Sequence, residues 1–136
     1  MPALFCDNAT MATTTLLSII ESAVHPNLSG TYKQLGIDET RCNSMRKALA
    51  ALKNRPFDFI VAEFFYGYGS NYAGVNISNL DVMLYSLQKY SPDTRVVVLV
   101  EKSEREYVDK LNEIFPLHAV LQYPVREADI KQVLDN

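Results

Sequence analysis

Glu63 is the residue whose type and position in this sequence best suit a functional site. It ends the run Asp58-Phe-Ile-Val-Ala-Glu63. A short apolar run without polar alternation is typical of a strand that is covered on both faces, as in a parallel sheet under helices. Ligands of open α/β sheets bind at the carboxyl ends of the strands. The identity of residue 63 should therefore matter more to function than that of its neighbours.

The other residue types that commonly do chemistry form no catalytic pattern. His25 and His118 lie far apart in the sequence with no nucleophile pattern near them, so we expect structural or surface roles. Cys6 and Cys42 have no CxxC partner and are interpreted as small buried hydrophobic residues. The turn over residues 7–11 has no glycine with which to cradle a phosphate group. An enzyme or a flavin-type carrier is therefore the least favoured class, and no catalytic residue is predicted.

The segment after Glu63 is rich in aromatic residues and glycine. Aromatic side chains on a loop are favoured at protein interfaces, because they bring contact area at a low cost in conformational entropy. They could instead fold back over a pocket at the end of the strand, and we expect both alternatives to hold in part. Phe64 and Phe65 are predicted to point inward, and the candidates for binding a partner are Tyr66, Tyr68 and Tyr72.

Length and composition predict one globular domain over residues 1–136. The chain has 48% hydrophobic and 21% charged residues with a net charge of −3, which is ordinary for a globular protein and not basic enough to suggest nucleic acid. The apolar stretch over residues 16–20 is too short to cross a bilayer, and no basic segment precedes it as in a signal peptide. We therefore expect a cytoplasmic protein that binds neither nucleic acid nor membrane.

Hydrophobic periodicity predicts five strands that alternate with five helices. Such an alternation is typical of a doubly wound α/β domain. The third and fourth predicted helices are expected to begin at capping boxes, Ser78–Asp81 and Ser103–Glu106. The predicted strands are Pro2–Asn8, Gly30–Gly36, Asp58–Glu63, Arg95–Val100 and Leu117–Gln122, and the predicted helices cover about 11–24, 39–53, 78–90, 103–115 and 127–134.

In this order of elements the chain resembles a response-regulator receiver domain. The resemblance extends from about Ala3 to Leu134 and rests on Asp7 after the first strand, on the acid-terminated third strand, on the Val-Val-Val-Leu-Val100 strand and on the turn Gln122-Tyr-Pro124. It implies a flavodoxin-like (βα)5 fold with a parallel sheet in the order 2-1-3-4-5. It also implies a site at the carboxyl ends of strands one, three, four and five, and a cis bond before Pro124.

Most catalytic positions that the resemblance implies are changed in this sequence. A receiver carries two acids after strand one, which hold Mg²⁺, a phosphoryl-accepting aspartate after strand three, a hydroxyl residue after strand four, and a lysine before the proline that follows strand five. The matching residues here are Asp7 and Asn8 for the acids, Glu63 for the acceptor, Val100 for the hydroxyl residue, and Tyr123 before Pro124 for the lysine.

These changes argue against phosphorylation. A glutamate carboxylate would overshoot a position built for aspartate, Val100 cannot donate a hydrogen bond, and Tyr123 brings no positive charge to a phosphoryl group. The favoured function is a pseudo-receiver, a protein-interaction or regulatory module that works without phosphorylation. The alternative is a receiver in a two-component phosphorelay with Glu63 as a phosphomimetic or atypical acceptor, although Val100 offers such a mimic no hydroxyl to attract.

A Mg²⁺ site is the one cofactor that the resemblance raises. Asp7 and Glu63, with one backbone carbonyl near Phe65, would be a thin ligand set for a cation that prefers several oxygens. The same two residues could equally be solvated carboxylates at strand ends. The predicted partner is a protein, such as a signalling or output domain, and the resemblance implies that a homodimer could form through helix four, strand five and helix five.

Overall fold

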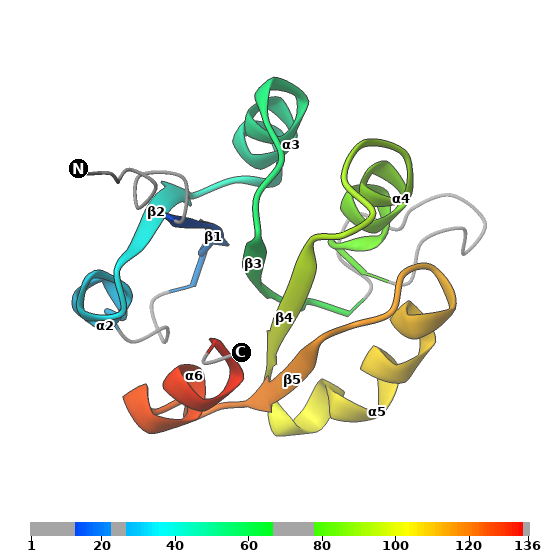
Figure 1. The fold of residues 1–136 in the computed structure, drawn as a ribbon. Coiled ribbons are helices and arrows are strands. Elements are labelled where there is room, and N and C mark those ends of the chain that lie inside the picture. The colour runs from blue at the N-terminus through cyan, green and yellow to red at the C-terminus, as the bar shows by residue number, and fades with distance from the viewer. Residues whose placement is uncertain (1–12, 23–26, 67–77, 135–136) are drawn as a thin grey trace, which may run out of the picture.

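The computed structural model describes residues 13–22, 27–66 and 78–134. They form a five-stranded sheet in which every neighbouring pair is parallel, in the order β2-β1-β3-β4-β5 (Figure 1). This order confirms the predicted flavodoxin-like fold. The strands are β1 (Thr14–Ile19), β2 (Ile37–Cys42), β3 (Phe59–Glu63), β4 (Arg95–Val100) and β5 (Ala119–Gln122).

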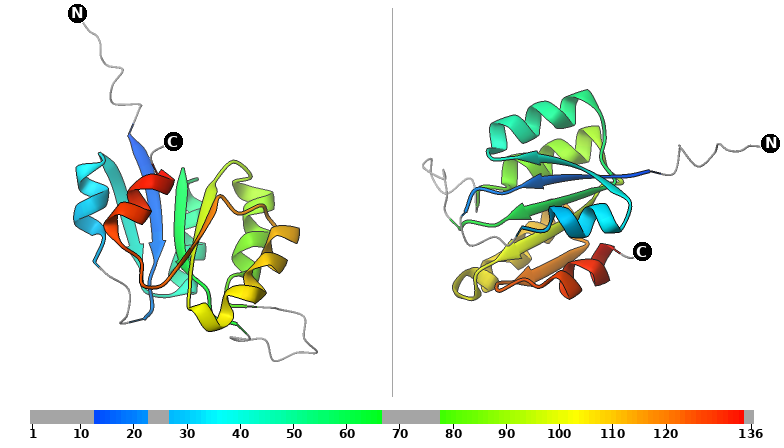
Figure 2. Two further views of the ribbon diagram at one scale, coloured as in Figure 1. Left: turned by 90° about the horizontal axis from the view of Figure 1, so that it is seen from below. Right: turned by 90° about the vertical axis from the view of Figure 1, so that its left-hand side faces the viewer.

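Helices cover both faces of the sheet. Figures 1 and 2 show α2 and α6 on one face and α3, α4 and α5 on the other. The two faces have separate hydrophobic clusters, since neighbouring residues of a strand point to opposite sides. The helices are α2 (Ser29–Gln34), α3 (Met45–Asn54), α4 (Asp81–Tyr90), α5 (Arg105–Val108) between the 3-10 segments η2 (Lys102–Glu104) and η3 (Asp109–Glu113), and α6 (Glu127–Leu134).

The central strands β3 and β4 are buried on both faces, as their unbroken apolar sequences predicted. All five residues of β3 are buried, and only Arg95 of β4 is exposed. Their parallel register places Glu63 opposite Leu99. The chain continues this pairing past β3, because the N–H of Phe64 donates to the Leu99 carbonyl at 2.8 Å. Glu63 therefore ends a strand that the surrounding core fixes rigidly.

The predicted helix over residues 11–24 is wrong, because Thr14–Ile19 of this stretch form β1. β1 lies between β2 and β3 and its last four residues are buried. A central strand of a parallel sheet needs a continuous apolar run, and three β-branched threonines lead into this one. The apparent helical spacing of its apolar residues was a consequence of that run. The predicted strand Pro2–Asn8 lies outside the described residues.

The next two predicted elements were also displaced. Gly30–Gly36 is mostly the helix α2, in which Tyr32 is buried, and Gly36 ends the helix with φ of +73°, a conformation that glycine adopts without strain. The helix predicted from about residue 39 begins only at Met45. Ser44 caps it, because its hydroxyl accepts a hydrogen bond from the Lys47 N–H at 3.2 Å. β2 precedes it as a charged, half-exposed edge strand, and such strands carry little hydrophobic signal.

The second half of the chain follows the prediction more closely. The carboxylate of Asp81 accepts hydrogen bonds from the N–H and hydroxyl of Ser78, both at 2.8 Å, at the start of α4. The predicted box Ser103–Glu106 makes no such cap, and the predicted helix there is divided into η2, α5 and η3. β5 and α6 lie where they were predicted. No helix of the described residues is long and apolar enough to cross a membrane.

Candidate functional site

The carboxylate of Glu63 is buried at the carboxyl edge of the sheet. The residue is 2% exposed, and β1 runs beside β3 with Ile19 opposite Ala62. The chain that leaves β1 therefore passes over the end of β3. There the backbone N–H groups of Glu21 and Ser22 both donate to Oε1 of Glu63, at 2.7 and 2.8 Å. Two consecutive amides thus hold one oxygen of the carboxylate.

Two hydroxyl groups hold the other oxygen. Ser22 Oγ donates to Oε2 of Glu63 at 2.5 Å, and the hydroxyl of Tyr123 donates to the same atom at 2.7 Å. Tyr123 follows β5, which lies two strands away from β3, and its bond to Pro124 is cis, as expected. We call this arrangement the Glu63 cage: the Glu63 carboxylate, the N–H groups of Glu21 and Ser22, and the hydroxyls of Ser22 and Tyr123.

The Glu63 cage stabilises the charged form of the carboxylate. Burial acts to raise the pKa of Glu63, but the hydrogen bonds from Ser22, Tyr123 and the two backbone amides outweigh it, so this pKa lies below its ordinary value. Burial, and then the bond to the Glu63 anion, raise the pKa of Tyr123, which keeps its hydroxyl protonated as a donor. Burial and the charge of Glu63 also raise the pKa of Glu21.

Two side chains hold the segment that leaves β3. The amide nitrogen of Asn79 donates to the Glu63 carbonyl at 2.9 Å, and its oxygen accepts from the Phe65 N–H at 2.7 Å. The backbone N–H of Asn79 donates to the Phe65 carbonyl at 3.2 Å. One residue later, the N–H of Tyr66 donates to the Glu104 carboxylate in η2 at 3.0 Å. The chain after the acceptor position is therefore tied to the start of α4 and to the segment after β4.

The aromatic residues after Glu63 divide as expected where they are described. Phe64 is 1% exposed and belongs to the core, and Phe65 is partly buried. Tyr66 is 48% exposed and stacks on Tyr107 of α5, with ring centroids 3.8 Å apart. The other two partner-binding candidates, Tyr68 and Tyr72, lie outside the described residues.

The prediction that Asp7 and Asn8 follow the first strand needs correction. β1 ends at Ile19, so the positions after it belong to Glu21 and Ser22. Asp7 and Asn8 lie outside the described residues. The error came from the misplaced first strand, and the signal that could have revealed it is the run Leu16–Ile20 followed by an acid, the same form as the run that ends at Glu63.

The last two predicted site residues, Val100 and Tyr123, contribute to packing and to hydrogen bonding at this edge of the sheet. Val100 is completely buried in the cluster under α3, α4 and α5, and its carbonyl accepts the Tyr123 N–H at 2.9 Å. Tyr123, which was expected to bring no positive charge to this edge, supplies a donor to Glu63. The roles of Ser22, Asn79 and Glu104 left no signal in the sequence, because their partners are distant in the chain.

The described residues at this edge do not fit the Mg²⁺ site that the resemblance implied. Both oxygens of Glu63 already accept hydrogen bonds, and a cation would have to displace those donors. In the described part of the chain, histidine, cysteine, aspartate and glutamate form no group of three or more that could hold a metal ion. A cation also prefers several oxygen ligands, and one occupied carboxylate does not provide them.

Solved structures of receiver domains share this fold. A response regulator receiver domain protein (CheY-like) from Methanospirillum hungatei JF-1 superposes with a TM-score of 0.71 at 12% identity, over 91% of this chain and 92% of that one. The chemotaxis response regulator CheY4 of Vibrio cholerae gives 0.70 at 16% identity, over 91% and 98%. NtrX from Brucella abortus, solved with ADP, gives 0.71 at 14% identity, over 90% of this chain and 26% of that one.

Comparison of the sequence alone adds nothing to this likeness, because no protein-family model and no curated protein matches the chain. At 12–16% identity the likeness to these solved structures establishes the fold. The chain therefore has the receiver fold, with a glutamate caged by hydrogen bonds at the end of its third strand.

Replacing Glu63 by glutamine tests the Glu63 cage through stability and its dependence on pH. The amide would present a donor to groups that are themselves donors, and each buried donor left without an acceptor costs about 1–3 kcal/mol, so we expect Glu63→Gln to lose at least about 2 kcal/mol near neutral pH. Because the folded-state pKa of Glu63 lies below the ordinary value of 4.5, its stabilisation is complete above that pH. It is lost as the pH falls through the folded pKa.

Urea denaturation near pH 7 and at several lower pH values measures both effects. The gap in unfolding free energy between wild type and Glu63→Gln should narrow below about pH 4.5. Glu113→Gln is the matched control, since Glu113 is exposed, and it should change stability by no more than about 0.5 kcal/mol. A Glu63→Gln protein as stable as wild type at pH 7 would contradict the geometry of the cage.

Proposed function

We propose that this chain is a pseudo-receiver: a signalling module with the receiver fold that binds a protein partner without being phosphorylated. The observation that carries the proposal is the Glu63 cage, in which the chain's own donors occupy both oxygens of the carboxylate at the acceptor position. In this proposal the module comprises residues 1–136 as one domain, acts in the cytoplasm and is not an enzyme.

The Glu63 carboxylate is poorly placed to act as a nucleophile. An attacking oxygen needs a free lone pair and an open approach to the phosphorus atom, but Glu63 is 2% exposed and each of its oxygens accepts two hydrogen bonds. Phosphoryl transfer also needs cations around the transferred group. The described residues form two ion pairs, Arg105–Asp109 and Arg126–Asp129, and neither involves Glu63. The four donors of the cage are neutral.

The hydroxyl residue that would respond to phosphorylation in a receiver is also replaced in this chain. By the resemblance, a hydroxyl residue after strand four turns towards the phosphoryl group, whereas Val100 offers only methyl groups, and these are buried in the core. The hydrogen bond from Tyr66 to Glu104 joins the segment after β3 to the segment after β4. Asn79 also holds the chain that leaves β3, through its bonds to Glu63 and Phe65. This supports a module that presents one constant surface to its partner.

The proposed partner surface consists of exposed aromatic and aliphatic residues on the segment after β3 and on α4. Tyr66 stacks on Tyr107, and α4 exposes Val82 and Tyr85 to about half of their full extent. Tyr68 and Tyr72 belong to the same proposed surface from the sequence. A homodimer through helix four, strand five and helix five of the receiver order would use α5, β5 and α6 instead, and it remains a second proposal for assembly.

A constitutively active receiver is the alternative function. Its support is the bond of 2.7 Å from Tyr123 to Glu63, since Tyr123 matches the lysine that contacts the phosphoryl group in the family that this chain resembles. The lowered pKa of Glu63 would keep a permanent negative charge at the acceptor position. The pseudo-receiver is preferred because Val100 cannot respond to that charge.

A small-molecule phosphodonor with Mg²⁺ tests phosphorylation directly. After incubation with acetyl phosphate, intact-mass spectrometry should show no added phosphoryl group on the wild type. Both oxygens of Glu63 already accept hydrogen bonds, and among the described residues no ion pair brings a cation to it. Glu63→Asp alone should behave in the same way. A wild-type protein with one added phosphoryl group that hydroxylamine removes would overturn the pseudo-receiver proposal and favour the phosphorelay alternative.

The partner surface has its own test, which compares two exposed apolar side chains. In a pull-down from the source cell, Tyr66→Ala should weaken capture of the specific partner, and Leu35→Ala, at the end of α2 on the other face of the sheet, should not. Tyr66 is half exposed, so the loss in stability should stay within the roughly 0.5–1.5 kcal/mol of one aromatic pair. Equal capture by both variants would remove Tyr66 from the partner surface.

A further inference from the structure

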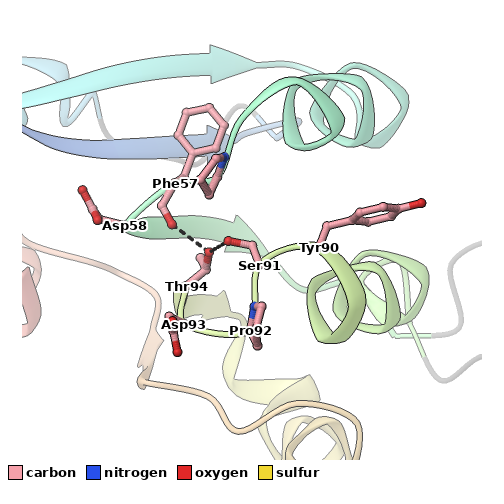
Figure 3. Close-up of a pocket in the computed structure, with 8 residues that line it drawn as sticks. Phe57, Asp58, Tyr90, Ser91, Pro92, Asp93 and Thr94 are labelled. Carbon is pink, nitrogen blue, oxygen red and sulfur yellow. Dashed lines mark hydrogen bonds between the residues drawn. The ribbon is translucent and has the colours of Figure 1, made fainter.

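A pocket lies at the opposite edge of the sheet from Glu63. It has a volume of about 330 Å³ and is lined by two short segments, residues 56–58 before β3 and residues 90–94 before β4. Figure 3 shows Thr94 and Ser91 between Phe57 on one side and Pro92 on the other. The pocket has no residue in common with the Glu63 cage.

Both buried hydroxyl groups of the pocket donate their protons to acceptors within the fold. Thr94 donates to the Phe57 carbonyl at 2.7 Å, and Ser91 Oγ lies 2.6 Å from Thr94 Oγ1. Because the single hydroxyl proton of Thr94 goes to a carbonyl, which can only accept, Ser91 must donate to Thr94. Ser91 Oγ therefore offers only lone pairs to a ligand. Both residues are buried, with exposures of 6% and 4%.

Two aspartates and two prolines make up most of the remaining lining, and the ring of Tyr90, whose hydroxyl can donate, extends away from them (Figure 3). Asp58 and Asp93 are exposed, and neither forms an ion pair with a described residue. Asp58 Oδ2 accepts from the N–H of Thr15 at 2.9 Å and from its hydroxyl at 3.3 Å. Pro56 and Pro92 have no backbone N–H.

The backbone N–H groups of the two buried hydroxyl residues are used within the fold. The N–H of Ser91 donates to the Leu87 carbonyl at 2.9 Å, and the N–H of Thr94 donates to the Ser91 carbonyl at 3.2 Å. The nearby cations lie over aromatic rings and do not line the pocket. Arg55 lies 4.8 Å from the Phe57 ring, Lys89 lies 5.3 Å from the Tyr90 ring, and Arg95 lies 5.7 Å from the Phe59 ring.

We propose that this pocket binds a guanidinium or ammonium group carried on an alkyl stem, as in an arginine or lysine side chain. Such a group has donors only, which complements the carboxylates of Asp58 and Asp93 and the lone pairs of Ser91. Its stem would pack against the rings of Pro56 and Pro92. This site does not depend on the state of Glu63 or on the proposed pseudo-receiver function.

Amide chemical shifts of the ¹⁵N-labelled protein test the site with two probes of nearly equal shape. N-acetyl-arginine amide should shift the amides of Asp58, Asp93 and Thr94. The citrulline counterpart, which is neutral, should bind about five-fold more weakly, because exposed charge pairs contribute modestly. Agmatine separates the sources of the group: binding as tight as that of the capped arginine favours a free amine, and weaker binding favours a peptide side chain.

Two variants complete the test. The double variant Asp58→Asn/Asp93→Asn keeps the shape of the pocket and an oxygen to accept from Thr15, and it should lose the preference for arginine over citrulline. Glu113→Gln removes an exposed carboxylate elsewhere and should keep that preference. The amide spectrum itself shows that each variant is folded. Equal binding of the two probes by wild type, or an unchanged preference in the double variant, would overturn the proposal.

Discussion

A carboxylate buried at the end of a central strand is the constraint on which this structure depends. An ionised carboxylate removed from water is strongly destabilising unless hydrogen bonds replace its hydration. Glu63 meets this requirement with four donors, two for each oxygen. A lone buried acid in this position would instead have a raised pKa and become neutral. The Glu63 cage keeps the charge and, with it, the geometry of this edge of the sheet.

The cage joins parts of the chain that are far apart in sequence. The segment after β1 supplies three of the four donors, and Tyr123 after β5 supplies the fourth. Asn79 and Glu104 then hold the chain that leaves β3. Because these four attachments converge on the end of β3, a change at Glu63 should disturb each of them. The same convergence leaves the carboxylate without the open approach that phosphoryl transfer needs.

How much of this could be predicted depended on how strongly each element was patterned. β3, β4 and α6 were located well, because a buried parallel strand and an amphipathic helix leave clear hydrophobic signals. β1 was mistaken for a helix, because its apolar residues also fit a helical face, and β2 was missed, because an edge strand is polar. This error moved the two positions that were matched to the acids of a receiver from Glu21 and Ser22 to Asp7 and Asn8.

The candidate site was predicted by position and missed in its contacts. The place of Glu63 at the end of a buried strand followed from the apolar run that precedes it, and the resemblance implied the cis bond after Tyr123. The donors from Ser22 and Tyr123 could not be foreseen, since hydrogen bonds over 41 and 60 residues depend on tertiary packing. The pocket at the other edge left no sequence signal, because its lining comes from two loops brought together by neighbouring strands.

The ionisation of Glu63 is the most direct test of this account. Side-chain carboxyl ¹³C shifts, assigned with the help of Glu63→Gln and followed over an acid titration, report the pKa of Glu63 itself. The account predicts a pKa of Glu63 below the ordinary value of 4.5. This pKa should rise when Tyr123→Phe removes one donor, while the same change at the exposed Tyr85 should have no effect. A wild-type pKa at or above 4.5, unmoved by Tyr123→Phe, would contradict it.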